Sequence, residues 1–120
     1  MTQIQPGASF RDNLSQLPPI TTVQRIELID TTDTVIAVLE NEPGKQGSLA
    51  VYQYLGQCFD ALDAKAARHG LEVFAEHTAD ARNRPGAHPN VDRLIAIAEG
   101  GGPLRVKIVT KDEIPVGNLS

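Results

Sequence analysis

The feature that most constrains the fold is a set of five apolar residues spaced three or four apart: Tyr52, Leu55, Phe59, Leu62 and Ala66. At about 100° per residue they form one narrow stripe, which predicts an amphipathic helix over about residues 48–69. Gly70 follows directly, and glycine commonly ends a helix in the left-handed conformation. We expect this helix to pack on a sheet built from the segments around it.

Four segments carry the patterns of β-strands. Residues 25–30 alternate apolar and polar side chains, while residues 34–41 contain a run, Val-Ile-Ala-Val-Leu, that is apolar on both faces. This run predicts a central strand that is covered above and below, joined to the first strand by a hairpin. Residues 71–77 and 104–108 also alternate, which predicts two further strands.

The remaining segments predict two more helices and a long loop. Ser9 has the position of an N-cap before a short helix that ends ahead of Pro18. Asn90 is expected to cap a second main helix over residues 91–99. Residues 78–89 are polar and too many for a tight turn, and long ordered loops in small domains are often functional.

The predicted order is helix, strand, strand, helix, strand, helix, strand. It indicates an α/β fold, with α+β as the alternative: a single four-stranded mixed sheet with two main helices packed on it and a short N-terminal helix. We expect residues 1–120 to form a single domain, with residues 1–8 and 111–120 as flexible ends.

Charge and cysteine content exclude several classes of function. A net charge of −4 and a pI of about 5.2 argue against nucleic acid or an anionic membrane as a partner, because phosphate neutralisation needs clustered Lys and Arg. The single cysteine, Cys58, allows neither an intramolecular disulfide nor a cysteine-based zinc cluster, and we expect a buried or half-buried inert thiol.

The chain shows no secretory signal and no apolar run near the roughly 20 residues of a membrane span, which predicts a cytoplasmic protein.

The turn before the long helix is a candidate anion site. Residues 42–48 contain two glycines next to the expected helix N-terminus, so that main-chain N–H groups can point at an anion. The candidate ligand-binding residues are Lys45, Gln46, Gly47 and Ser48. The alternative is a plain strand-to-helix turn with Ser48 as the cap, and the run does not match a Walker loop.

A second candidate site lies between residues 76 and 93, where two of the three histidines stand beside carboxylates. Histidine and carboxylate side chains are the ligands that zinc and iron take, so a divalent metal held by Glu76, His77, Asp80 and His88 is one interpretation. Their spacing matches no named metal motif. The alternative is a hydrogen-bonded His77 at a strand end and a solvated His88 in a turn.

The same stretch is also rich in arginine. Arg84 and Arg93, with Arg82 nearby, could hold a carboxylate or phosphate together with the N-terminus of the helix that begins near residue 91. The alternative is that these arginines pair with carboxylates on the surface.

Four segments carry a likeness to a known family: residues 25–30 (RIELID), 43–52 (PGKQGSLAVY), 70–79 (GLEVFAEHTA) and 88–94 (HPNVDRL). The chain resembles a family of short bacterial proteins catalogued as a domain of unknown function, over roughly residues 10–110. The resemblance implies a bacterial cytoplasmic protein and supplies neither an activity nor catalytic residues.

Three hypotheses about function follow, and whether the protein is an enzyme stays open. The first is a pocket for a small anionic ligand, formed by the turn and the 76–93 segment, with His77 or His88 as acid or base in an enzymatic version. The second is a metal-binding protein that uses the segment holding His77 and His88. The third is a non-catalytic homodimeric interaction or accessory protein, with Tyr54 facing away from the apolar stripe and available at an interface.

Overall fold

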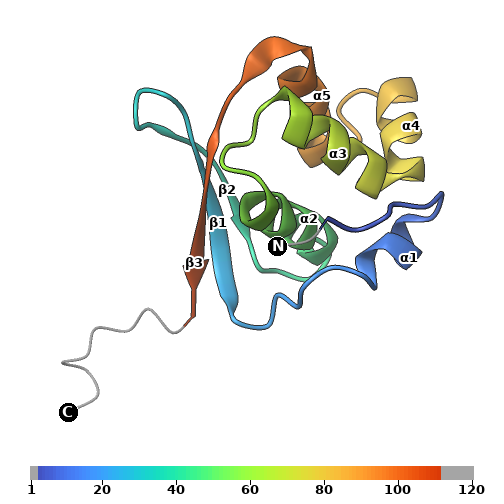
Figure 1. Ribbon diagram of the computed structural model, residues 1–120, viewed down its shortest axis with the longest axis horizontal. Helices are drawn as coiled ribbons and strands as arrows, with labels where there is room; N and C mark the ends of the chain where they lie inside the picture. Colours follow the sequence, from blue (N-terminus) through green and yellow to red (C-terminus); the bar gives the residue numbers. More distant parts are fainter. Residues whose placement is uncertain (1–2, 112–120) are drawn as a thin grey trace.

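A computed structural model describes residues 3–111. Its elements in chain order are α1 (Phe10–Leu14), β1 (Val23–Ile29), β2 (Val35–Glu40), α2 (Gln46–Cys58), α3 (Ala64–Phe74), α4 (Glu76–Asn83), α5 (Pro89–Ala96), a short π-helical turn η1 (Ile97–Gly101) and β3 (Arg105–Thr110). The three strands form one antiparallel sheet in the order β2-β1-β3. The helices gather on one side of this sheet (Figure 1).

Three of the predicted strands are confirmed. Residues 25–30, 34–41 and 104–108 fall on β1, β2 and β3, and β1 pairs with β2 through the expected hairpin. Ile26 and Leu28 of β1 are fully buried and face the helices. Their cross-strand partners are apolar as well: Leu39 and Ala37 on β2, Ile108 and Val106 on β3.

The fourth predicted strand is wrong, and the sheet is antiparallel where a mixed sheet was predicted. Residues 71–77 are helical instead: they form the end of α3 and the start of α4. Leu71 and Phe74 are both buried at helical spacing, but the same residues also fit the alternation of a strand. Packing against neighbouring helices decides between the two, and that information is not local.

The predicted helix over residues 48–69 is in fact two helices. α2 ends at Cys58 and α3 begins at Ala64. Between them Leu62 makes an isolated antiparallel bridge with Leu104, with N···O distances of 2.8 and 3.0 Å. The side chain of Asp63 then caps α3 by accepting a hydrogen bond from the Ala66 N–H at 2.9 Å. The apolar stripe therefore runs over two helices and the loop that joins them.

Gly70 lies inside α3, where a helix end was predicted. A Cβ at this position would come within 2.7 Å of Leu55 Cδ1 and 2.8 Å of Leu94 Cδ1. Those two leucines come from α2 and α5, so the glycine marks the point where three helices approach most closely. Its missing side chain serves packing and not chain reversal.

β2 lies at the edge of the sheet, contrary to the prediction of a central strand. Three of its large apolar side chains are about half exposed: Val35 at 46%, Ile36 at 51% and Val38 at 48%. Only one face of β2 is covered by helices, through Leu39 and, in part, Ala37. A two-sided apolar run is therefore no proof of a central position.

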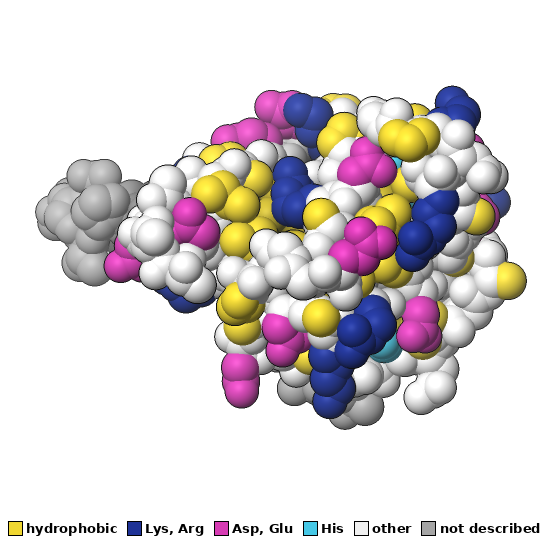
Figure 2. Space-filling view, turned by 90° about the horizontal axis from the view of Figure 1, so that it is seen from above, with side chains coloured by type: hydrophobic (Ala, Val, Ile, Leu, Met, Phe, Trp, Pro, Cys, Tyr) yellow, Lys and Arg dark blue, Asp and Glu magenta, His cyan; other side chains and the backbone are white. Residues whose placement is uncertain are grey.

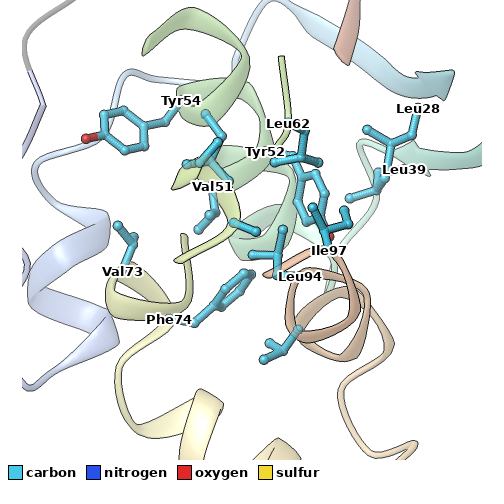
Figure 3. Close-up of a cluster of buried hydrophobic side chains, with 14 of the residues drawn as sticks. Leu28, Leu39, Val51, Tyr52, Tyr54, Leu62, Val73, Phe74, Leu94 and Ile97 are labelled. Carbon is cyan, nitrogen blue, oxygen red and sulfur yellow. The ribbon is translucent and has the colours of Figure 1, made fainter. Parts of the chain in front are cut away.

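The prediction that Tyr54 is at an interface is wrong, because its side chain is fully buried. Tyr52 and Tyr54 leave α2 in opposite directions (Figure 3). The Tyr54 hydroxyl accepts a hydrogen bond from the Ile4 N–H at 2.8 Å and lies 2.6 Å from Nε2 of His69. Burial raises the pKa of Tyr54 and lowers that of His69, which favours the neutral form of both side chains. Cys58 on the same helix is half-buried, as expected.

The described part of the N-terminal segment is hydrogen-bonded to the body of the protein. Asn13 is fully buried and donates to the carbonyls of Gly7 and Val73 at 3.1 and 3.0 Å. Ser9 is the N-cap of α1, as predicted. Of the ends expected to be flexible, residues 1–2 and 112–120 lie outside the described residues.

Ala75, between α3 and α4, has φ +51° and ψ −117°, a conformation that favours glycine. We expect Ala75→Gly to raise the free energy of unfolding by about 1 kcal/mol, because relief of about 1–3 kcal/mol of backbone strain exceeds the entropic cost of glycine. Urea denaturation checks this. Ala79→Gly is the matched control, since Ala79 is an exposed residue inside α4 and should lose about 1 kcal/mol. Equal losses in both variants would contradict the assignment of strain to Ala75.

Tyr54→Phe removes the hydroxyl that joins α2 to Ile4 and His69. We expect a loss of about 1 kcal/mol in the free energy of unfolding, because the partly buried partners of the hydroxyl lose their hydrogen bonds. In hydrogen exchange, the Ile4 amide should lose its protection. An Ile4 amide that stays as protected as in the wild type would show that Tyr54 does not hold this segment.

Candidate functional site

The two segments predicted to form a site meet at one pocket of about 510 Å³. The pocket lies beside β2, at the N-termini of α2 and α5 and next to the junction of α3 with α4. Its lining residues are Phe10, Val38, Leu39, Glu40, Gly44, Lys45, Gly47, Ser48, Phe74, His77, Ala87, His88, Pro89, Asn90 and Val91. The structure therefore brings together Lys45, Gly47 and Ser48 with His77 and His88, as the sequence predicted.

The N-terminus of α2 forms one end of the pocket. Lys45 occupies the N-cap position, and no side chain among the described residues caps the helix, so the prediction of Ser48 as the cap is wrong. The Lys45 ammonium lies 3.3 Å from the Glu42 carboxylate, and both side chains are more than half exposed. Gln46 does not line the pocket, and its Nε2 donates to Asn41 Oδ1 at 2.9 Å.

The N-terminus of α5 forms a second wall. His88 is at the N-cap position, Pro89 begins the helix, and again no described side chain caps it. Asn90, which was predicted to be the cap, instead uses Oδ1 to accept a hydrogen bond from Arg93 Nη1 at 2.9 Å. That prediction is therefore wrong, because α5 begins at Pro89 and Asn90 is its second residue and not its N-cap.

His88 is fixed by a carboxylate. Its Nε2 lies 2.6 Å from Asp80 Oδ2, and Asp80 also makes a two-bond ion pair with Arg84 one turn further along α4. Hydrogen bonds from Arg84 first, and then from His88, hold the pKa of Asp80 far below its usual range. Asp80 is therefore ionised, and it favours the His88 tautomer with the proton on Nε2. This leaves Nδ1 as the nitrogen that can accept a proton.

His77 lies between Phe10 and His88. Its ring centroid is 4.9 Å from that of Phe10, in an edge-on arrangement, and 5.3 Å from that of His88. Its neighbour Glu76 is used elsewhere: Oε1 accepts a hydrogen bond from the Phe10 N–H at 2.7 Å. That bond is the main reason why the pKa of Glu76 is lowered, and it holds α1 against the pocket.

The four candidate metal ligands do not gather around one point. Asp80 and His88 are in contact and His77 is near His88, while Glu76 is bonded to α1. Within residues 3–111, no group of three or more His, Cys, Asp or Glu side chains is arranged to hold a metal ion.

The arginines lie outside the lining of the pocket. Arg84 pairs with Asp80 and is exposed. Arg82 lines a separate, open hollow between α4 and α5. Arg93 donates to the hydroxyl of Tyr52 at 3.2 Å and its guanidinium carbon lies 5.7 Å from the centre of the tyrosine ring.

Tyr52 is a structural residue of the site that the sequence did not reveal. Its hydroxyl donates to the Asn90 carbonyl at 2.6 Å, and burial raises its pKa to about 12, so the group stays protonated. This bond ties α2 to the start of α5. The aromatic wall of Phe10 and Phe74, whose ring centroids lie 5.2 Å apart, was also missed, because the two residues are distant in the sequence.

Asp80→Asn tests the support of His88. The folded-state pKa of Asp80 is lowered. Its ionised form therefore stabilises the fold fully at pH values above the unfolded-state pKa of about 3.9. This stabilisation is lost as the pH falls through the folded-state pKa. We expect the wild type to be more stable than Asp80→Asn at neutral pH and the difference to shrink steadily below about pH 4. Urea denaturation of both proteins along a pH series measures it. A difference that does not change with pH would show that the ionised carboxylate contributes nothing.

Comparison with known proteins identifies the family to which this chain belongs. No curated protein and no solved structure matches the chain. Within residues 3–111, no helix has the length and apolar character needed to cross a membrane. The family model described as "uncharacterized protein conserved in bacteria" (DUF2322) matches residues 10–108, as the resemblance in the sequence indicated. The chain therefore belongs to this bacterial family.

Proposed function

We propose that this protein binds a small anionic ligand, a carboxylate or a phosphate, in the pocket between β2 and the N-termini of α2 and α5. The observation that carries the proposal is the convergence of Lys45, His77 and His88 on one pocket. These residues come from three separate parts of the chain. Lys45 and His77 carry N–H groups that can donate to an anion, whereas the Nε2–H of His88 is used by Asp80.

The polar end of the pocket suits a negative charge. Lys45 supplies an ammonium group, and the first N–H groups of α2 have no intrahelical partner. The positive end of the helix dipole points to the same place. Glu40 also lines the pocket. Arg25 lies opposite it in the sheet register but pairs with Glu27 at 2.9 Å, so Lys45 and the N-terminus of α2 must outweigh this carboxylate.

The rest of the lining indicates that the ligand has an apolar part. The large apolar residues of the lining are Phe10, Phe74, Val38, Leu39 and Val91. The volume of about 510 Å³ falls within the range of small-molecule sites, roughly 300–1,000 Å³. An aromatic or branched carboxylate combines the two properties, with the charge at Lys45 and the apolar body against the phenylalanines.

His88 is the residue we assign to proton transfer if the ligand is chemically converted. It lines the pocket and its Nε2 is engaged by Asp80. A histidine with one nitrogen held by a carboxylate can exchange a proton through the other. His77, which packs against Phe10, is assigned to ligand contact.

Isothermal titration with sodium benzoate, sodium acetate and sodium phosphate tests the proposal. We expect saturable binding, with benzoate the strongest because it fills the apolar part of the pocket. Lys45→Ala should weaken binding about tenfold, which corresponds to about 1.4 kcal/mol. Lys65→Ala is the matched control, since Lys65 is an exposed lysine of α3 outside the pocket, and it should bind like the wild type.

Two results would contradict the proposal. One is the absence of saturable heat with all three anions up to about 10 mM. The other is equal weakening by Lys45→Ala and Lys65→Ala, which would show only a general loss of positive charge.

A further inference from the structure

The pocket borders the free edge of the sheet. The Asn41 N–H donates to the Gln24 carbonyl, so Asn41 directs its main-chain groups toward β1. The register shift in the β1–β2 pair lies beyond Ala37, so the register is regular from Ala37 to Asn41. Main-chain groups alternate in direction along a strand. Those of Val38 and Glu40 therefore point away from β1, and no described strand pairs with them.

The same part of β2 lines the pocket. Val38, Leu39 and Glu40 form one side of it, and His77 and His88 belong to the other parts of its lining. The Glu40 carbonyl accepts a hydrogen bond from the Glu42 N–H at 3.0 Å, so a ligand that enters along this edge would meet the N–H and C=O of Val38 and the N–H of Glu40 as well as Lys45. Such groups are the usual means by which a protein holds an extended peptide.

The edge also lacks the features that normally block strand addition. Natural edge strands are protected by charged side chains or proline, but residues 35–39 contain neither. Val35, Ile36 and Val38 instead expose about half of their surface. In the view from above, hydrophobic side chains gather on the part of the molecule where the β1–β2 hairpin projects in Figure 1 (Figure 2).

We propose that β2 binds the C-terminal segment of a partner protein as an added parallel strand, with the terminal carboxylate in the pocket beside Lys45. The inference rests on the proposed function, because the carboxylate is the anion. The peptide carries apolar residues at alternate positions, which pack beside Val38 and Ile36 on the exposed face of the sheet.

Chain direction determines the orientation of this peptide. β2 runs toward Glu40, and the turn to Lys45 follows it directly. A parallel strand therefore ends at the polar end of the pocket, where its carboxylate meets the ammonium group. An antiparallel strand would place its N-terminal ammonium there and lose this complementarity.

Charge also argues against a second copy of this chain as the occupant. Antiparallel pairing of two β2 edges would bring the hairpin end of one copy, with Asp30 and Asp33, beside Glu40 and Glu42 of the other. Arg105 pairs with Asp33 and Lys45 with Glu42, which leaves Asp30 of one copy and Glu40 of the other facing each other without an ion pair among the described residues. Like charges across a strand pair are destabilising.

An array of heptapeptides tests the inference. The peptides are attached at their N-termini, have free C-termini and carry Val, Leu, Ile or Phe at alternate positions. The strongest binder is then measured in solution by fluorescence anisotropy, beside the same peptide with a C-terminal amide. We expect the amide to bind at least tenfold more weakly and Lys45→Ala to produce a similar loss for the free acid.

Val38→Pro tests the main-chain pairing. Proline removes an N–H that points away from β1, so the sheet can keep its own hydrogen bonds. We expect Val38→Pro to lose peptide binding by at least tenfold and Val38→Ala, which keeps the N–H, to lose less than threefold. If Val38→Pro does not fold, peptides that are N-methylated at one amide each are tested on the wild-type protein instead. Methylation should then abolish binding at every second position of the peptide.

The outcomes separate this inference from the proposed function. Benzoate binding without binding of any array peptide overturns the inference and leaves the small-anion site standing. Absence of both overturns both. Equal binding of the free acid and the amide overturns the proposed peptide strand, and so does equal peptide binding by Val38→Pro and Val38→Ala. Light scattering that shows a dimer of this chain, abolished by Val38→Lys, overturns it as well.

Discussion

The burial of α2 is the constraint on which the rest of the structure depends. Seven consecutive residues, Leu49–Leu55, are buried, so the helix is covered on every side and not along one stripe. The sheet lies on one side of it and α3 and α5 on the other (Figure 1). The third side is closed by the N-terminal segment through the bond between Ile4 and Tyr54. A chain of this size can surround one helix completely, and the outer elements take their places around it.

This central helix also builds the pocket. Its N-terminus emerges beside the edge strand β2, where Gly47 lies against Phe10 of α1 and Gly44, Lys45, Gly47 and Ser48 line the pocket. Tyr52 ties the helix to the start of α5, and the leucines at Gly70 bring α3 and α5 close to it. The histidines on α4 and at the start of α5 are held in place by these contacts. The position of the site is therefore a consequence of core packing.

Sequence reasoning succeeded where the signal was local. The β1–β2 hairpin, the Ser9 cap and β3 are each defined by neighbouring residues. The two segments that carry Lys45 and the histidines were also expected to share one site and they line one pocket, although one ground for that expectation, a strand over residues 71–77, is wrong.

The failures have one common physical cause, which is that tertiary packing decided between locally equal choices. The stripe from Tyr52 to Ala66 is continuous in sequence, but Leu62 leaves the helix to pair with Leu104. Residues 71–77 fit a strand as well as a helix until Gly70 is seen to be a point of close approach. Asn90 fits an N-cap by residue type, but α5 begins at Pro89 and the Asn90 side chain lies inside the helix, bonded to Arg93.

The central claim is that the pocket at Lys45, His77 and His88 is the binding site for an anion. Amide chemical-shift mapping during titration with sodium benzoate tests it most directly. The account predicts saturable shifts for the amides of residues 44–48 and 87–91 with one dissociation constant, and little change in β3. Shifts confined to the α4–α5 hollow lined by Arg82 and Asp92, or the absence of saturable shifts, would contradict it.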